Sequence, residues 1–235
     1  MSTKRIAFVS NKGGTGKTTA CVNVAACLKE KKVLVIDLDP IASTTSYLGV
    51  KPEEFGEYSM QAVARGEKEI EDVIFEVENA GIHLAPSHRG GIFDRIKKGF
   101  LAKEIKKIDS YDFIMIDTPP GFDEMPKEAI AACDIPIAAL NESIFTAENL
   151  PLLKEFAGKE GKIIKYAILS TVNRRSKTSK EVIDALSKEF ERSFIVPFDK
   201  RVPQSQAFGE PLIYLKRSKA LKCYMSIAEF LAGGV

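Results

Sequence analysis

Short apolar runs alternate with helix-like segments along the whole chain, and this alternation restricts the fold more than any other feature. Several runs are apolar throughout, which is typical of strands covered on both faces. Expected strands cover residues 5–10, 33–38, 82–85, 113–117, 135–140, 163–170 and 194–196. Expected helices cover residues 17–31, 93–108, 125–132, 146–157, 177–190 and 218–231, with shorter ones at 59–65 and 68–75. The pattern predicts an α/β fold, a doubly wound, mostly parallel sheet with helices on both faces.

Size and composition narrow the class of protein. The chain has 235 residues, of which 45% are apolar and 28% charged, as in soluble globular proteins. We expect one domain over residues 1–235, because no linker or internal repeat interrupts the chain. No apolar run reaches 18 residues, so no membrane span is expected. The four cysteines are scattered without a Cys-x-x-Cys pair, which gives metal–sulfur sites little support and predicts reduced thiols in a cytoplasmic protein.

A glycine-rich loop joins the first expected strand to the first expected helix. Residues 12–19 read Lys-Gly-Gly-Thr-Gly-Lys-Thr-Thr, although a standard P-loop has glycine where this chain has Asn11. Glycines let successive backbone N–H groups point at phosphate oxygens, and the following helix adds its positive end. Lys17 should reach the β- and γ-phosphates, and the Thr18 hydroxyl should ligate Mg²⁺. We predict that ATP and Mg²⁺ are the cofactors. The predicted cradle is Lys12, Gly13, Gly14, Thr15, Gly16, Lys17, Thr18 and Thr19.

Acidic residues end two further apolar runs. Asp37 and Asp39 follow one strand on a single pleat face, and Asp117 ends another before Thr-Pro-Pro-Gly. An acid at a strand end beside a triphosphate holds Mg²⁺, usually through water, or orients the attacking water. We expect Asp117 to hold the metal through water, with Asp37 as a further candidate. The alternative for Asp37 and Asp39 is a pair that caps a loop.

These three segments together resemble the motifs of the ParA/MinD family of ATPases. Residues 12–19 look like that family's deviant Walker A motif, and residues 113–121 look like its Walker B strand and switch loop. Residues 37–41 are similar to its Asp-x-Asp-Pro-Gln motif, except that Ile41 stands where glutamine is usual. The resemblance implies catalytic roles for Lys12, Lys17 and Asp39. In it, Lys12 reaches the nucleotide of the facing subunit in an ATP-sandwiched homodimer, Asp39 positions the water, and Asp37 supports Asp39.

A base site is expected after the strand at residues 163–170. The amide of Asn173 can donate to and accept from adenine at once, and relatives in this family place a base-contacting Asn here. Pro197 lies in a Val-Pro-Phe segment that resembles the one whose backbone closes over the base. The chain has no Asn-Lys-x-Asp motif, which guanine specificity would favour.

Basic residues concentrate in the last third of the chain. Residues 162–222 hold 14 lysines and arginines against 6 acids, a local charge of +8 in a chain of net charge +2. Such a region suggests a polyanionic partner, although a solvated lysine-rich face is the alternative. The resemblance extends to small Soj-like ParA proteins, whose dimers bind DNA without sequence preference. Arg175 and Arg201 match two of their DNA-binding positions, and the expected neighbours are Lys177, Lys180, Arg217 and Lys219.

The leading hypothesis is therefore a plasmid or chromosome partition ATPase associated with the nucleoid. It would dimerise around ATP, bind DNA nonspecifically, and hydrolyse ATP slowly until a ParB-like partner bound to the cargo stimulates it. No membrane partner is expected. The first strand begins near residue 5, so the N-terminal helix-turn-helix domain of larger ParA proteins is expected to be missing. The alternatives are a MinD-like or other positioning ATPase that moves a protein cargo, and a metabolic or redox P-loop relative.

Overall fold

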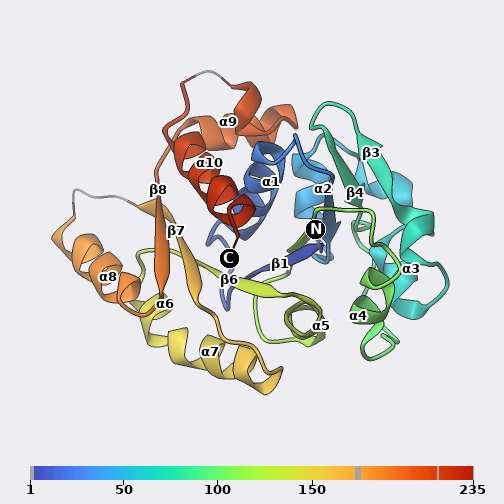
Figure 1. The fold of residues 1–235 in the computed structure, drawn as a ribbon, viewed down its shortest axis with the longest axis horizontal. Helices are drawn as coiled ribbons and strands as arrows, with labels where there is room; N and C mark the ends of the chain where they lie inside the picture. The colour runs from blue at the N-terminus through green and yellow to red at the C-terminus, as the bar shows by residue number, and fades with distance from the viewer. Residues whose placement is uncertain (1–2, 173–175, 216, 235) are drawn as a thin grey trace.

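A computed structural model describes residues 3–172, 176–215 and 217–234 of the chain. Its eight strands form a single sheet in the order β3-β4-β2-β5-β1-β6-β7-β8 (Figure 1). The strands are β1 (Lys4–Val9), β2 (Val33–Asp37), β3 (Phe75–Val77), β4 (Ile82–Ala85), β5 (Phe113–Asp117), β6 (Ile135–Leu140), β7 (Tyr166–Val172) and β8 (Arg192–Pro197). All neighbours pair in parallel except β3, which runs antiparallel to β4 at one edge. The expected mostly parallel, doubly wound sheet is confirmed.

The strand order brings three functional segments to one edge of the sheet. β5 lies between β1 and β2, and Asp117 at its end pairs in register with Asp37 at the end of β2. Because the three strands are parallel, the loops that follow them start from the same edge. The glycine-rich loop and both acidic segments therefore meet there.

Helices cover both faces of this sheet. The α-helices are α1 (Lys17–Cys27), α2 (Ser43–Tyr47), α3 (Met60–Arg65), α4 (Phe100–Ile105), α5 (Glu124–Ala132), α6 (Ile144–Glu148), α7 (Leu150–Lys159), α8 (Lys177–Ser187), α9 (Arg201–Phe208) and α10 (Lys219–Ala232). Three 3₁₀ turns, η1 (Pro52–Phe55), η2 (Ile70–Val73) and η3 (Leu212–Tyr214), complete the described elements. Helices α1 and α10 lie side by side on one face, and α5 and α7 lie on the other (Figure 1).

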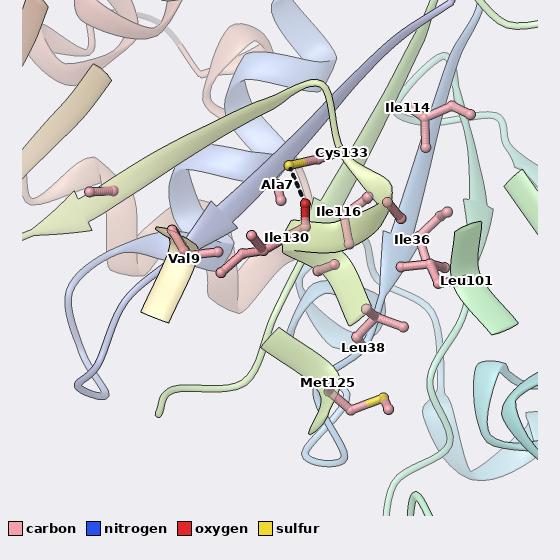
Figure 2. Close-up of a cluster of buried hydrophobic side chains, with 14 of the residues drawn as sticks. Ala7, Val9, Ile36, Leu38, Leu101, Ile114, Ile116, Met125, Ile130 and Cys133 are labelled. Atoms are coloured by element: carbon pink, nitrogen blue, oxygen red, sulfur yellow. Dashed lines mark hydrogen bonds between the residues drawn. The ribbon is translucent and has the colours of Figure 1, made fainter. Parts of the chain in front are cut away.

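Alternate residues of the central strands build the two halves of the core. In β1, Ala7 and Val9 point to the face covered by α5, whereas Ile6 and Phe8 point to the face covered by α1. Figure 2 shows the first half, where side chains of β1, β2 and β5 pack against α5. Within this cluster the Cys133 thiol donates to the carbonyl oxygen of Ile130 at 3.3 Å. Both faces of these strands are buried, which explains why the runs in the sequence are apolar throughout.

The structure corrects several expected helices. The helix expected over 93–108 forms only as α4, because Arg95 and Gly99 adopt positive φ angles of 50° and 74° that interrupt a right-handed helix. The short helix expected over 68–75 is η2 followed by the edge strand β3, and the helix expected over 146–157 is divided into α6 and α7. Helices α2 and α9 were not expected. No helix within the described residues is long and apolar enough to cross a membrane.

Candidate nucleotide-binding site

The glycine-rich loop curls tightly between β1 and α1. Gly14 and Gly16 have φ angles of 72° and 87°, which favour glycine. A Cβ atom at Gly16 would also lie 2.7 Å from the Ser170 hydroxyl oxygen, so a larger residue would collide with the end of β7. The hydroxyls of Ser10 and Thr15 donate to the carbonyl oxygen of Lys12 at 3.1 and 3.4 Å. The loop is therefore shaped before any ligand arrives.

The two lysines of this loop have opposite environments. Lys17 is 6% exposed at the first position of α1, whereas Lys12 is exposed. Burial lowers the pKa of Lys17, and the negative charges of Asp117 and Asp39 act against that shift. Lys17 is thus a desolvated cation that faces two carboxylates inside the site. Lys12 is exposed to solvent, so its ammonium group can contact another molecule outside the site.

Asp117 is fully buried and only half satisfied. Its Oδ2 atom accepts hydrogen bonds from the hydroxyls of Thr18 and Thr44, both at 2.7 Å. Its Oδ1 atom is buried with no hydrogen-bond partner within the described residues. Burial raises the pKa of Asp117 to about 6, opposed chiefly by the charge of Lys17. A buried carboxylate oxygen without a donor is costly unless a ligand, metal or water completes it.

Asp37 is held quite differently. Its Oδ1 atom accepts from the backbone N–H of Asp39 at 3.0 Å, and its Oδ2 atom accepts from the N–H and hydroxyl of Thr45 at 2.9 and 2.8 Å. Burial, followed by the charge of Asp117, raises the pKa of Asp37 to about 7. Asp39 is 7% exposed, and its Oδ1 atom accepts from the N–H of Ile41 at 2.9 Å. Asp37 therefore fixes the strand end that carries Asp39.

Two adjoining hollows follow from this arrangement. A cleft of about 500 Å³ is lined by the loop from Gly13 to Thr19 together with Asp39, Pro120 and other residues after β2. A more apolar hollow of about 280 Å³ contains Pro197 and Val196. Both include Gly14, Gly16, Thr19 and Gln206 in their walls. A cleft lined by the glycine-rich loop, Lys17 and Asp39, beside a more apolar hollow that could take a ring, has the form of a nucleotide site.

The residues present fit a divalent cation bound together with phosphate. The described chain contains no group of three or more His, Cys, Asp or Glu side chains that could hold a metal. Mg²⁺ keeps several waters and takes one or two protein ligands plus phosphate oxygens. Thr18 and the unpartnered Oδ1 atom of Asp117 lie side by side where such an ion would need them.

The basic residues expected to bind DNA are divided between two places. Lys177 and Lys180 are exposed in the first turns of α8, where Lys177 lies 3.9 Å from Glu181. Arg201 and Lys219 lie at the starts of α9 and α10, where the backbone N–H groups of both donate to Asp199. Arg217 is exposed two residues before Lys219. Asn173 and Arg175, expected at the base and at DNA, lie outside the described residues.

Sequence reasoning missed several residues of the site, including Ser43, Ser46 and Tyr47 in the wall of the cleft. Thr44 and Thr45 belong to α2, and their hydroxyls bind the two buried acids. Gln206 in α9 donates to the Thr19 hydroxyl at 3.3 Å, and Arg89 lines the phosphate cleft from the turn after β4. Runs of threonine and serine after an Asp-x-Asp segment could have indicated Thr44 and Thr45. No pattern in the sequence indicates Gln206 or Arg89.

Known proteins resemble this chain in sequence and fold. A family model described as an AAA domain matches residues 3–165. The virulence plasmid ParA family protein pGP5-D of Chlamydia psittaci is 31% identical over 201 residues, which cover 80% of this chain and 77% of that protein. The chain belongs to the ParA/MinD family of P-loop ATPases. Its chemistry is therefore ATP hydrolysis.

Two further relatives match over almost the full length. The chromosome-partitioning ATPase Soj of Thermus thermophilus is 29% identical and covers 96% of this chain and 94% of its own. The septum site-determining protein MinD of Pyrococcus horikoshii, solved with Mg-ADP, has a TM-score of 0.84 and 26% identity and covers 99% of this chain and 98% of its own. Partition and cell-division proteins thus share the fold of this ParA/MinD-family ATPase.

Proposed function

We propose that this ATPase drives DNA partition by cycling between a monomer and an ATP-bound homodimer that binds DNA without sequence preference. The contrast between its two loop lysines carries the proposal. Lys17 is buried in the cradle and can neutralise phosphate charge within one chain, whereas Lys12 is exposed and lines neither hollow. An exposed lysine at the edge of a phosphate site can complete a second subunit's site at little cost, because it needs no burial within its own chain.

Within the site, each residue has a separate part in hydrolysis. The glycine loop and Lys17 hold the phosphates, while Thr18 and Asp117 hold Mg²⁺, Asp117 through water. Bound Mg²⁺ would supply charge neutralisation at the terminal phosphate. Asp39, held by Asp37, positions the attacking water. Turnover by one chain alone is slow, because a second subunit or a partner must complete the site.

DNA binding is proposed for the basic residues near the starts of α9 and α10. Arg201 and Lys219 lie close together because the starts of α9 and α10 are both tied to Asp199, and Arg217 lies two residues before Lys219. Lys177 and Lys180 on α8 would form a second basic group. Phosphate binding of this kind needs clustered charge rather than base contacts, and it weakens steeply with salt.

A gel-shift experiment tests this proposal directly. Purified protein with ATP and Mg²⁺ should retard DNA of arbitrary sequence at low salt, and should not do so with ADP. The double change Arg201→Ala and Lys219→Ala should weaken DNA binding at least tenfold while ATP binding is unchanged. Lys159→Ala on α7 is a matched control, because that lysine is exposed, as Lys219 is, but lies outside both basic groups. Equal retardation with ATP and ADP would contradict the proposed cycle.

Lys12 has its own test. Lys12→Ala should abolish the ATP-dependent dimer, measured by light scattering, while one chain still binds nucleotide with nearly unchanged affinity. Lys17→Ala should lose both. Equal loss of nucleotide binding in the two variants would show that Lys12 binds phosphate within its own chain.

Two further experiments test the alternatives of a protein cargo and of a membrane partner. A cargo-bound partner of the ParB-like kind should stimulate hydrolysis in the presence of DNA. Helix α10 packs its buried face, which includes Tyr224 and Leu231, against α1 and β8. That packing buries the main apolar face of this helix within the protein, so sedimentation with ATP and anionic liposomes should recover no protein.

A further inference from the structure

Arg89 is a cation in the phosphate cleft that neither the motifs nor the proposed cycle uses. It lies in the turn after β4 and lines the same cleft as Lys17, Asp39 and Ile41. Among the described residues that line this cleft, Lys17 and Arg89 are the cations and Asp39 is the acid. The cleft must therefore neutralise a triphosphate with few positive groups, and Arg89 is one of them.

The guanidinium of Arg89 is held on the Asp39 side of the cleft. Its Nη2 atom donates to the Ser46 hydroxyl at 2.6 Å, and its Nε atom donates to the carbonyl oxygen of Ile41 at 3.5 Å. The N–H of Ile41 in turn binds Asp39. Arg89 is thus placed beside the acid expected to position water, which is the terminal-phosphate end of the site.

The ion pair that now occupies Arg89 is easily exchanged. Its Nη1 atom lies 2.9 Å from Glu53, and the two side chains are 49% and 56% exposed. Exposed ion pairs contribute little to stability. A phosphate oxygen in a partly desolvated cleft is a stronger acceptor for a guanidinium, which can bind it with two parallel N–H groups. When ATP binds, the contact of Arg89 with a phosphate oxygen would therefore compensate for its lost ion pair with Glu53.

The backbone that carries Arg89 is rigid, so only its side chain needs to move. The N–H of Ser87 donates to the Thr45 hydroxyl at 3.1 Å, and that hydroxyl binds Asp37. The buried amide of Gln61 accepts from the N–H of His88 and donates to its carbonyl oxygen, both at 3.0 Å. The turn is tied through these contacts to the strand end that holds Asp39. A preorganised backbone reduces the entropy lost when the side chain binds a ligand.

We propose that Arg89 is a further ATP-binding residue, which exchanges Glu53 for the γ-phosphate of the nucleotide bound in the same chain. It distinguishes ATP from ADP, because ADP lacks the group that Arg89 binds. This inference depends on ATP binding alone and not on DNA partition, so the two fail separately.

The test compares a non-hydrolysable ATP analogue with ADP, each with Mg²⁺, by fluorescence titration. Arg89→Ala should weaken the analogue about tenfold, the loss expected for one charge-assisted hydrogen bond. ADP affinity should change less than about twofold, since no contact is lost. Arg89→Lys should retain part of the preference. Arg65→Ala is the matched control, because Arg65 is also ion-paired, to Glu67 at 2.7 Å, but lies outside the cleft.

Glu53→Gln tests the exchange of partners. It removes the charge that holds Arg89 in the nucleotide-free chain, so the analogue should bind at least as tightly as to the wild type. Equal weakening of the analogue and ADP by Arg89→Ala would show that Arg89 only supports the turn, and no change in either would show that it does not reach the phosphate. Weakening of the analogue by Glu53→Gln would overturn the exchange.

Discussion

The carboxyl ends of β2 and β5 carry two buried acids that are neighbours in the sheet but are satisfied in opposite ways. Asp37 accepts three hydrogen bonds from its own chain, distributed over both oxygens. Asp117 accepts two hydroxyl donors on one oxygen and keeps the other without a partner. Burial alone therefore does not distinguish a structural acid from one prepared for a ligand. The hydrogen-bond donors around each carboxylate oxygen distinguish the two kinds of acid.

The largest expected effect separates the two acids by activity. Asp117→Ala should reduce Mg²⁺-dependent ATP hydrolysis by about 100-fold or more, because charge stabilisation by a metal is worth several kcal/mol of the barrier. Its folding should suffer less, since the Thr18 and Thr44 hydroxyls can rotate to other acceptors. Phosphate release measured over a Mg²⁺ titration checks this. Hydrolysis within about threefold of the wild type would leave Asp117 without a metal role.

The second effect is on stability and belongs to Asp37. Asp37→Ala should lower the free energy of unfolding by about 3 kcal/mol, because the buried N–H groups of Asp39 and Thr45 lose their acceptor. Urea denaturation of the nucleotide-free protein measures the change, with Asp117→Ala as its matched partner. A larger loss in Asp117→Ala than in Asp37→Ala would reverse the comparison. It would also support the expectation from the sequence that Asp37 is a metal candidate.

The threonines that bind these acids give a finer test. Thr45 donates to Asp37 at 2.8 Å and also accepts from the N–H of Ser87 at 3.1 Å, whereas the hydroxyl of Thr44 donates to Asp117 at 2.7 Å. Both are fully buried. Thr45→Val should therefore cost about 2 kcal/mol and Thr44→Val about 1 kcal/mol, one increment for each hydrogen bond lost. Equal costs in urea denaturation would mean that the link from Thr45 to Ser87 adds nothing.

Sequence patterns predicted the central strands because burial on both faces leaves a signal in every residue. The expected runs at 113–117 and 135–140 coincide with β5 and β6, and the acids fall at the strand ends as expected. The order of the strands gave no such signal. The register of Asp37 with Asp117 depends on β5 entering between β1 and β2, which no local pattern encodes.

Helices set by tertiary contacts were the ones missed. Helix α2 has the sequence Ser-Thr-Thr-Ser-Tyr, whose residues have weak helix propensity. Its Thr44 and Thr45 hydroxyls hold it against the two acids instead. Helix α9 contains Pro203 in its first turn, where proline is tolerated, and its Ser205 contacts Tyr47 of α2. Arg89 was missed for the same reason, because only the fold brings the turn after β4 to the cleft.

The last comparison of the two acids is the pH dependence of stability without any ligand. Burial raises the pKa of Asp37 to about 7 and that of Asp117 to about 6, from the ordinary value of 3.8. Between pH 3.8 and these raised pKa values, the two carboxyl groups keep their protons in the folded chain but have lost them in the unfolded chain. The free energy of unfolding should therefore fall as pH rises from about 4 to about 7 and level off above that, with a slope of at most about 1.4 kcal/mol per pH unit for each proton.

Asp37→Asn isolates the part of this slope that belongs to the fully bonded acid. The amide does not titrate, so the decrease between about pH 4 and pH 7 should be shallower in the variant than in the wild type. Urea denaturation at several pH values, without nucleotide or Mg²⁺, gives both curves. Parallel curves would show that Asp37 is already ionised throughout this range, held so by its three donors. In that case hydrogen bonding outweighs burial at β2, and the unpartnered oxygen of Asp117 makes β5 the only one of the two strand ends where burial dominates.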